Sequence, residues 1–156
     1  MNAGREPTRI DIVETETEAD AVPVWLGRPA QGDGTCRGGY GAAVVAYYGA
    51  DCAYCGRDLS ETYESWLDLS VDHVVPRNAV GAGFPAEWIE DLHNHVPCCR
   101  ACNEFLNGFR MATEVPADII GFLALRDSVL EAKRARAEDR HRRERQNYQR
   151  WKAGSR

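Results

Sequence analysis

Two Cys-x2-Cys pairs constrain this chain more than any other feature of its sequence. Cys52 and Cys55 form the first pair, and Cys99 and Cys102 form the second after 43 intervening residues. Zinc with a structural role binds four ligands in a closed tetrahedron, and two such pairs offer four thiolates from two separate segments. Because metal binding contributes folding free energy directly, the pairs predict a small domain built around a structural Zn²⁺. Four thiolates also accept iron, and this alternative stays open.

The two remaining cysteines receive no role. Cys98 competes with Cys99 because a Cys-x3-Cys spacing to Cys102 also suits a metal, but Cys99 repeats the spacing of the first pair. Cys36 lies in a segment rich in Gly, Pro and acidic residues. Six cysteines in a chain whose acidic first 20 residues do not resemble a secretory signal favour metal binding over disulfides. No apolar run approaches the roughly 20 residues that span a bilayer, so a cytoplasmic protein without membrane contact is expected.

The charge of the chain is distributed unevenly along its 156 residues, although the net charge is only −5. Residues 1–20 carry six acidic and two basic residues, whereas residues 126–156 carry eleven Lys or Arg and five acidic residues. We therefore expect an acidic, largely irregular N-terminal segment (1–40), a core (41–125) and a basic helical arm (126–156). The local charge of such an arm, not the net charge, decides whether the chain attracts nucleic acid.

Hydrophobic periodicity predicts a mixture of a few strands and helices. Residues 67–72 alternate between apolar and polar with period two, which indicates a strand that ends at His73 with Asp72 facing away from the buried side. Residues 42–48 form an apolar run that suits either a helix or a strand. Helical patterns are expected at 86–92, 103–109, 119–130 and 133–152.

Two motifs lie between and around the cysteine pairs: DHVVP at residues 72–76, and Asn94 followed by CRACN at residues 99–103. In this order they resemble the His-Asn-His (HNH) endonuclease family in its four-cysteine version, and the chain is similar to phage recombination endonuclease VII. The family pattern is an Asp-His at a strand end, a central Asn, and Cys-x2-Cys-Asn opening a helix. The resemblance covers about a third of the chain. It implies an α+β fold with a small ββα-metal, treble-clef-like core that zinc stabilises.

The resemblance implies a metal-dependent nuclease that hydrolyses DNA phosphodiester bonds. His73 would be the general base, a role for which a pKa near neutrality suits an imidazole. Asn94 would orient the catalytic loop. Asp72 and Asn103 would hold a divalent cation, and their oxygen ligands favour Mg²⁺ or Mn²⁺ over zinc. The zinc held by the four cysteines would be purely structural.

The chain departs from the family pattern in its basic residues. The family commonly places a Lys shortly after Cys-Asn, but residues 103–108 are NEFLNG. The positive charge for phosphate contacts would then come from arginines near the site and in the arm, namely Arg77, Arg100, Arg110, Arg142, Arg143 and Arg145. The alternative for the arm is a solvated helix with Glu–Arg pairs such as Glu138–Arg142. His93 and His95 receive no role, and His141 is expected to be solvated.

Two other functions stay open. A non-catalytic zinc module could bind nucleic acid or protein, although simple binding has no need of the combination of Asp72, His73 and Asn103. A toxin or accessory nuclease could act together with a partner protein. The sequence does not distinguish duplex, nicked and branched DNA, and because one active site cuts one strand, duplex cleavage would require a homodimer or two events.

Overall fold

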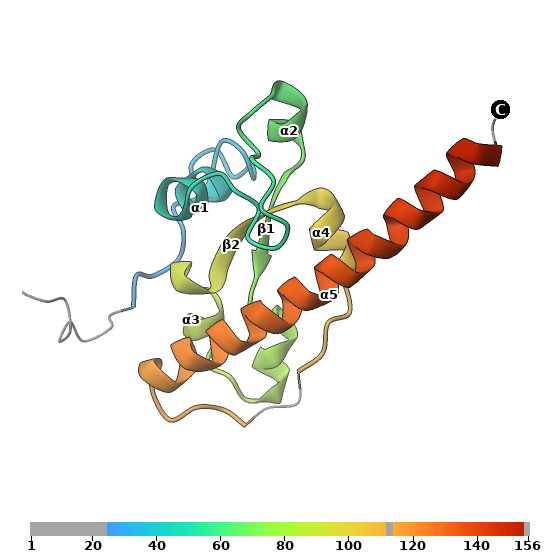
Figure 1. Cartoon of the computed structure of the whole chain (residues 1–156). Helices are drawn as coiled ribbons and strands as arrows, with labels where there is room; N and C mark the ends of the chain where they lie inside the picture. Colours follow the sequence, from blue (N-terminus) through green and yellow to red (C-terminus); the bar gives the residue numbers. More distant parts are fainter. Residues whose placement is uncertain (1–24, 112–113, 155–156) are drawn as a thin grey trace, which may run out of the picture.

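A computed structural model of the chain describes residues 25–111 and 114–154 (Figure 1). Much of the predicted acidic N-terminal segment lies outside the described residues, and residues 25–39 form no helix or extended strand. The elements follow in the order α1 (Tyr40–Tyr48), α2 (Tyr63–Leu67), β1 (Leu69–His73), η2 (Arg77–Ala82), α3 (Ala86–Ile89), η3 (Leu92–Asn94), β2 (His95–Cys99), α4 (Arg100–Phe105) and α5 (Ile119–Gly154). This mixture of helices and a small sheet is compatible with a small zinc-stabilised α+β domain.

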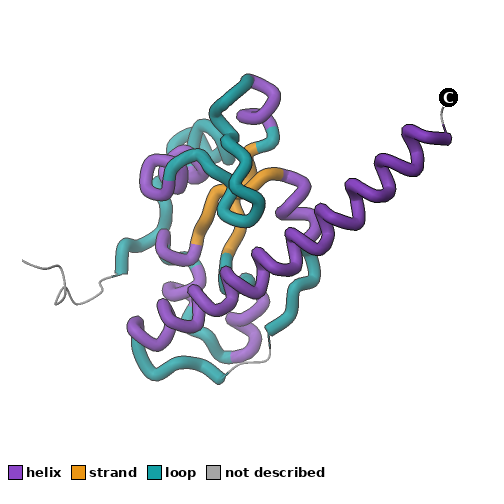
Figure 2. The backbone as a smooth tube through the Cα atoms, viewed as in Figure 1, coloured by secondary structure: helices purple, strands orange, loops and turns teal. Residues whose placement is uncertain are grey.

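The two strands form an antiparallel sheet at the centre of the helices (Figure 2). The register pairs Leu69 with Cys99 at one end and His73 with His95 at the other. Because side chains alternate between the two faces of a strand, Asp72 and His73 point to opposite faces. Helix α5 covers the face of Asp72, where Lys133 contacts it, and α1 lies on the face of His73.

Helix α5 connects the two parts of the hydrophobic core. Its buried residues are spaced along one side of the helix, as an amphipathic helix requires: Phe122, Val129, Leu130, Lys133 and Ala137. Phe122 packs with Val75, Ala79, Phe84 and Ile89, whereas Val129 and Leu130 pack with the residues around the cysteine pairs. Beyond Ala137 the described part of α5 buries no residue, and Figure 1 shows this half of the helix projecting away from the sheet.

Local hydrogen bonds explain where the elements differ from the predicted ranges. The strand begins at Leu69, not at residue 67, because Thr62 caps α2 by accepting from Ser65 N, and α2 then takes in Leu67. Helix α4 begins at Arg100, not at 103, because Cys99 Sγ accepts from Cys102 N and caps it. The apolar run at 42–48 is helical.

A single helix, α5, takes the place of the two predicted at 119–130 and 133–152, and it has no break at the expected boundary of the arm. Asp118 precedes it and accepts a hydrogen bond from Gly121 N at 2.9 Å. No helix within residues 25–111 and 114–154 combines the length and apolar character needed to cross a membrane.

Replacing Phe122 by Ala should lower the free energy of unfolding by about 3–5 kcal/mol, because this fully buried ring fills the space between α5 and the loop after β1. Chemical denaturation of the zinc-loaded protein measures the change. Ile120, two residues earlier and 59% exposed, is the matched control, and Ile120→Ala should change stability by no more than about 0.5 kcal/mol. Equal effects of the two substitutions would show that α5 does not dock as described.

Candidate metal centre and active-site pocket

The four cysteines of the two predicted pairs meet at one point. The Sγ atoms of Cys52, Cys55, Cys99 and Cys102 all lie within 4.8 Å of one another, and Cys55 Sγ is 3.9 Å from Cys99 Sγ. A tetrahedral zinc with Zn–S bonds of about 2.3 Å places its sulfurs about 3.8 Å apart. The cluster could therefore hold a zinc ion, as the spacing of the pairs predicts.

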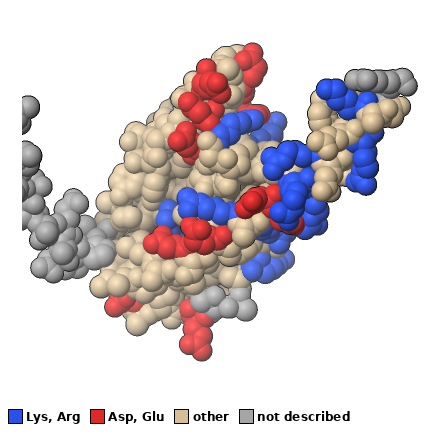
Figure 3. Space-filling model, viewed as in Figure 1, with Lys and Arg blue, Asp and Glu red and all other residues tan. Residues whose placement is uncertain are grey.

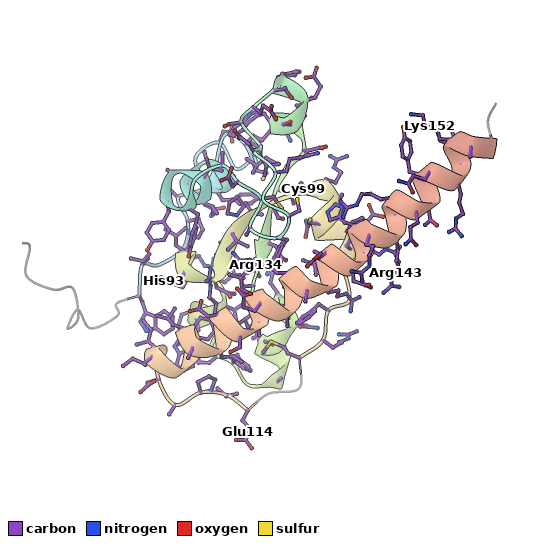
Figure 4. The ribbon with its side chains drawn as sticks, in the orientation of Figure 1. His93, Cys99, Glu114, Arg134, Arg143 and Lys152 are labelled. Atoms are coloured by element: carbon purple, nitrogen blue, oxygen red, sulfur yellow. The ribbon has the colours of Figure 1, made fainter. Side chains whose placement is uncertain are left out.

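Two turns bring these sulfurs together. The first pair lies on a turn in which Gly56 N donates to Cys52 O at 2.9 Å, and Gly56 takes a left-handed φ of 73° that favours glycine. The second pair lies at the corner between β2 and α4, where Figure 4 labels Cys99. The backbone N–H of Cys99 donates to Cys52 Sγ at 3.3 Å, and that of Cys102 donates to Cys99 Sγ at 3.4 Å. Such donors stabilise thiolate ligands and orient them.

The protons within the cluster are shared unequally. A hydrogen bond from Cys102 lowers the pKa of Cys52 to about 6 and also lowers the pKa of Cys55, while the pKa of Cys102 is raised because its proton is held by these neighbours. A metal needs all four deprotonated, so its binding would release protons.

Two further cysteines and one histidine lie near the four-cysteine cluster. Cys98 is fully buried but lies outside the cluster, and burial raises the pKa of its thiol well above the ordinary range. Cys36 also lies outside, with Sγ 3.7 Å from Leu69 O. The expectation of a solvated His141 is wrong: its Nε2 lies 3.2 Å from Cys102 Sγ, because α5 passes beside the cluster.

A second group of side chains that could ligate a metal surrounds His73 at the end of β1. One ligand atom each of His73, Glu90 and His95 lies within 4.8 Å of the others. His73 Nε2 is 3.7 Å from Glu90 Oε1, and the His73 and His95 rings have centroids 4.2 Å apart. These residues line a pocket of about 490 Å³ together with Arg28, Pro29, Gln31, Tyr40, Val71 and Arg77.

Burial favours the neutral form of both imidazoles of this pocket by lowering their pKa values. It lowers the pKa of His73 to about 4, and the neighbouring His95 lowers it further than burial alone would. Burial also lowers the pKa of His95. Among the described residues, His73 Nε2 has no hydrogen-bond partner although the atom is buried. A neutral imidazole with a free ring nitrogen can accept a proton or bind a metal.

Asp72, the predicted cation ligand, lies on the opposite face of the sheet from the His73 ring. Its Oδ2 accepts a hydrogen bond of 2.5 Å from the Tyr54 hydroxyl and one of 2.6 Å from Lys133 Nζ. The same ammonium donates to His73 O at 2.7 Å, and Lys133 is only 2% exposed. The partly buried Asp72 carboxylate therefore already has a neutralising cation, which is the Lys133 ammonium.

The two asparagines have different surroundings. Asn94 is fully buried and holds the loop after β1: its Oδ1 accepts from Val75 N at 2.8 Å, and its Nδ2 donates to Val75 O and Ile89 O at 2.9 Å each. Asn103, on α4, donates from Nδ2 to Ser70 Oγ at 2.7 Å. Since Ser70 and Asp72 share one face of β1, Asn103 packs on the face of the sheet that carries Asp72.

The predicted phosphate-binding arginines do not gather in one place. Arg77 Nε donates to Glu90 Oε1 at 3.0 Å beside the His73 pocket, whereas Arg100 and Arg110 are exposed near the ends of α4. Arg142 and Arg143 pair with Asp139, which replaces the predicted Glu138–Arg142 pair. Figure 3 shows basic side chains along the projecting half of α5, the region where Figure 4 labels Arg143 and Lys152.

Sequence reasoning missed three residues of these surroundings: Glu90, His95 and Lys133. The signal for His95 is the strand register, because antiparallel pairing that opposes residues 73 and 95 puts both histidines on one face. Glu90 and Lys133 approach through tertiary packing, and no local pattern signals their positions.

Comparisons of the chain with models of known protein families, with curated proteins and with solved structures found no match.

Replacing Cys99 by Ser should remove the bound zinc, because three thiolates remain and the cap of α4 is weakened. Elemental analysis of the purified protein should give about one zinc per chain for the wild type and much less for this variant. The adjacent Cys98→Ala is the control and should retain zinc, since Cys98 lies outside the cluster. If Cys98→Ala lost its zinc while Cys99→Ser kept it, the zinc ligand would be Cys98 and not Cys99.

Proposed function

We propose that this chain is an endonuclease of the HNH type that hydrolyses DNA phosphodiester bonds, with Mg²⁺ or Mn²⁺ as the cation that the family resemblance implies. The observation that carries the proposal is the neutral His73 at the end of β1, whose buried Nε2 has no hydrogen-bond partner among the described residues. The order of the two motifs around the four-cysteine cluster is a second observation that supports the proposal.

In the proposed reaction His73 accepts a proton from the attacking water. The low pKa of His73 keeps its imidazole unprotonated at neutral pH, but it lies below the near-neutral value expected from the sequence and makes the imidazole a weaker base. Arg77 and Arg28, which line the same pocket, would attract the phosphate. Asn94 would act as a positioning residue, since it ties the backbone at Val75 to the segment before β2.

Asp72 and Asn103 are the cation ligands that the resemblance implies, but in this arrangement they do not fit a divalent cation. The Lys133 ammonium and the Tyr54 hydroxyl occupy Asp72 Oδ2, and Lys133 is buried. This occupation favours the second candidate function, a non-catalytic zinc module that binds nucleic acid or protein. Plasmid cleavage separates the two functions.

The projecting half of α5 would provide the contact with DNA. Residues 138–154 carry six basic and three acidic side chains, and the acidic ones pair with only part of the arginines. Tyr148 and Trp151 are 56% and 66% exposed and stack with centroids 6.0 Å apart. Clustered cations next to exposed aromatic rings suit a nucleic-acid backbone with accessible bases.

His73→Ala should reduce cleavage of supercoiled plasmid, in buffer with Mg²⁺ or Mn²⁺, by about 10²–10⁴-fold, because it removes the proton acceptor. His93→Ala is the matched control and should cut at nearly the wild-type rate, since His93 pairs with Asp91 outside the proposed centre. Both variants are compared as zinc-loaded proteins with wild-type circular dichroism.

Equal cutting by wild type and His73→Ala would contradict the role of His73. If the wild-type protein cuts neither plasmid, single-stranded nor branched DNA, the binding-module function replaces the nuclease proposal.

Replacing Arg142, Arg143 and Arg145 together by Gln should weaken duplex DNA binding and flatten its salt dependence. Each phosphate contact contributes a slope of about −0.9 to log K against log salt, so three lost contacts reduce the slope by about 2.7. Fluorescence anisotropy at several salt concentrations measures it. Arg37→Gln, in the segment before α1, is the control and should leave the slope unchanged. An unchanged slope in the triple variant would show that the arm is a solvated helix only.

A further inference from the structure

The three side chains around His73 have donor chemistry that differs from the centre implied by the family resemblance. Two imidazoles and one carboxylate are the ligands found at zinc and related transition-metal sites, whereas Mg²⁺ prefers oxygen ligands alone. The ligand atoms of His73, Glu90 and His95 already lie within 4.8 Å of one another. We propose that these three residues bind one transition-metal ion of the Zn²⁺ class, separately from the four-cysteine cluster.

The orientation of the two histidines supports this site. His95 Nδ1 lies 2.8 Å from the carbonyl oxygen of Asp91, and this hydrogen bond fixes the tautomer whose Nε2 is free to ligate. His73 Nε2 is buried, is 3.7 Å from Glu90 Oε1 and has no hydrogen-bond partner among the described residues. A buried ring nitrogen without a partner costs free energy, and a bound cation would supply the missing interaction.

The surroundings hold this ligand set in place and leave it accessible. Asp91 is 1% exposed and receives hydrogen bonds from Gly27 N at 2.6 Å and His93 N at 2.9 Å, so the carbonyl behind His95 belongs to a rigid segment. The pocket of about 490 Å³ gives entry from solvent. Three protein ligands leave a fourth tetrahedral position for water or an anion.

Arg77 is the competing cation at this site. Its Nε donates to Glu90 Oε1 at 3.0 Å, but its side chain is 72% exposed and can turn away into solvent. A bound ion would therefore replace Arg77 as the partner of Glu90. Because the Arg77 side chain is largely exposed and water can solvate it after it leaves Glu90, this exchange costs the metal little affinity.

Metal binding here would have a consequence for the proposed nuclease. A His73 that donates its Nε2 lone pair to a metal cannot accept a proton with the same atom. If His73 is the general base, as proposed above, Zn²⁺ beyond the structural equivalent should inhibit Mg²⁺-supported cleavage. This consequence rests on the proposed function, whereas the binding itself does not.

The test is isothermal titration of Zn²⁺ into the full chain that already holds its structural zinc. The wild type should bind one further equivalent. His95→Ala and Glu90→Gln should bind it at least about tenfold more weakly while keeping the structural zinc and the wild-type circular dichroism. Arg77→Gln should bind it up to about fivefold more tightly, a gain that a misfolded variant cannot imitate.

His93→Ala is the matched control, because its ring pairs with Asp91 Oδ1 and lies outside the ligand set. It should bind the further equivalent as the wild type does. Absence of a further equivalent in the wild type, or equal binding by His95→Ala, would overturn the site. Loss of binding in His93→Ala with retention in His95→Ala would move the ion to His93 and Asp91. If the ion binds as proposed but accelerates cleavage, the result supports the metal site and contradicts the role of His73 as general base.

Discussion

The meeting of four sulfurs from two distant turns is the constraint on which the rest of the structure depends. A two-stranded sheet is at best marginally stable by itself, and β1 and β2 contain only five residues each. The cysteine cluster joins the turn at Cys52 to the corner where β2 becomes α4, and its backbone N–H donors lie in that corner. A metal held there would hold the end of the sheet, the start of α4 and, through His141, the middle of α5.

Because side chains alternate between the two faces of β1, neighbouring polar residues of this strand lie on opposite sides of the sheet. Asp72 is directed to α5, where Lys133 and Tyr54 satisfy it, and His73 is directed to the pocket on the other face. Two adjacent residues thereby acquire opposite environments. The Asp72 carboxylate is paired with Lys133, whereas His73 lines the pocket and its Nε2 has no hydrogen-bond partner among the described residues.

The sequence predicts those features that depend on spacing along the chain. The four-cysteine cluster follows from two repeated pairs, and the strand that ends at His73 follows from a period of two. The sequence pattern places the start of α4 three residues late, because its cap is a cysteine sulfur, which ordinary capping residues do not suggest. His95 receives no role from the sequence because its significance depends on the register of two strands. The Lys133–Asp72 contact joins residues 61 positions apart, and in an arm rich in charge nothing distinguishes one lysine that is buried.

Lys133 links the arm to the centre of the molecule. Its ammonium bridges Asp72 Oδ2 and His73 O, and removing it alone would leave the partly buried Asp72 carboxylate without this neutralising partner. A divalent cation at Asp72 would have to replace this ammonium, which is why the side chains in this arrangement do not fit one. Lys133 lies on the buried side of α5, between Leu130 and Ala137, so a charged contact as well as apolar packing holds this part of the helix against the sheet. The same helix continues into the basic projection, so α5 carries both the residue that pairs with Asp72 and the exposed basic side chains.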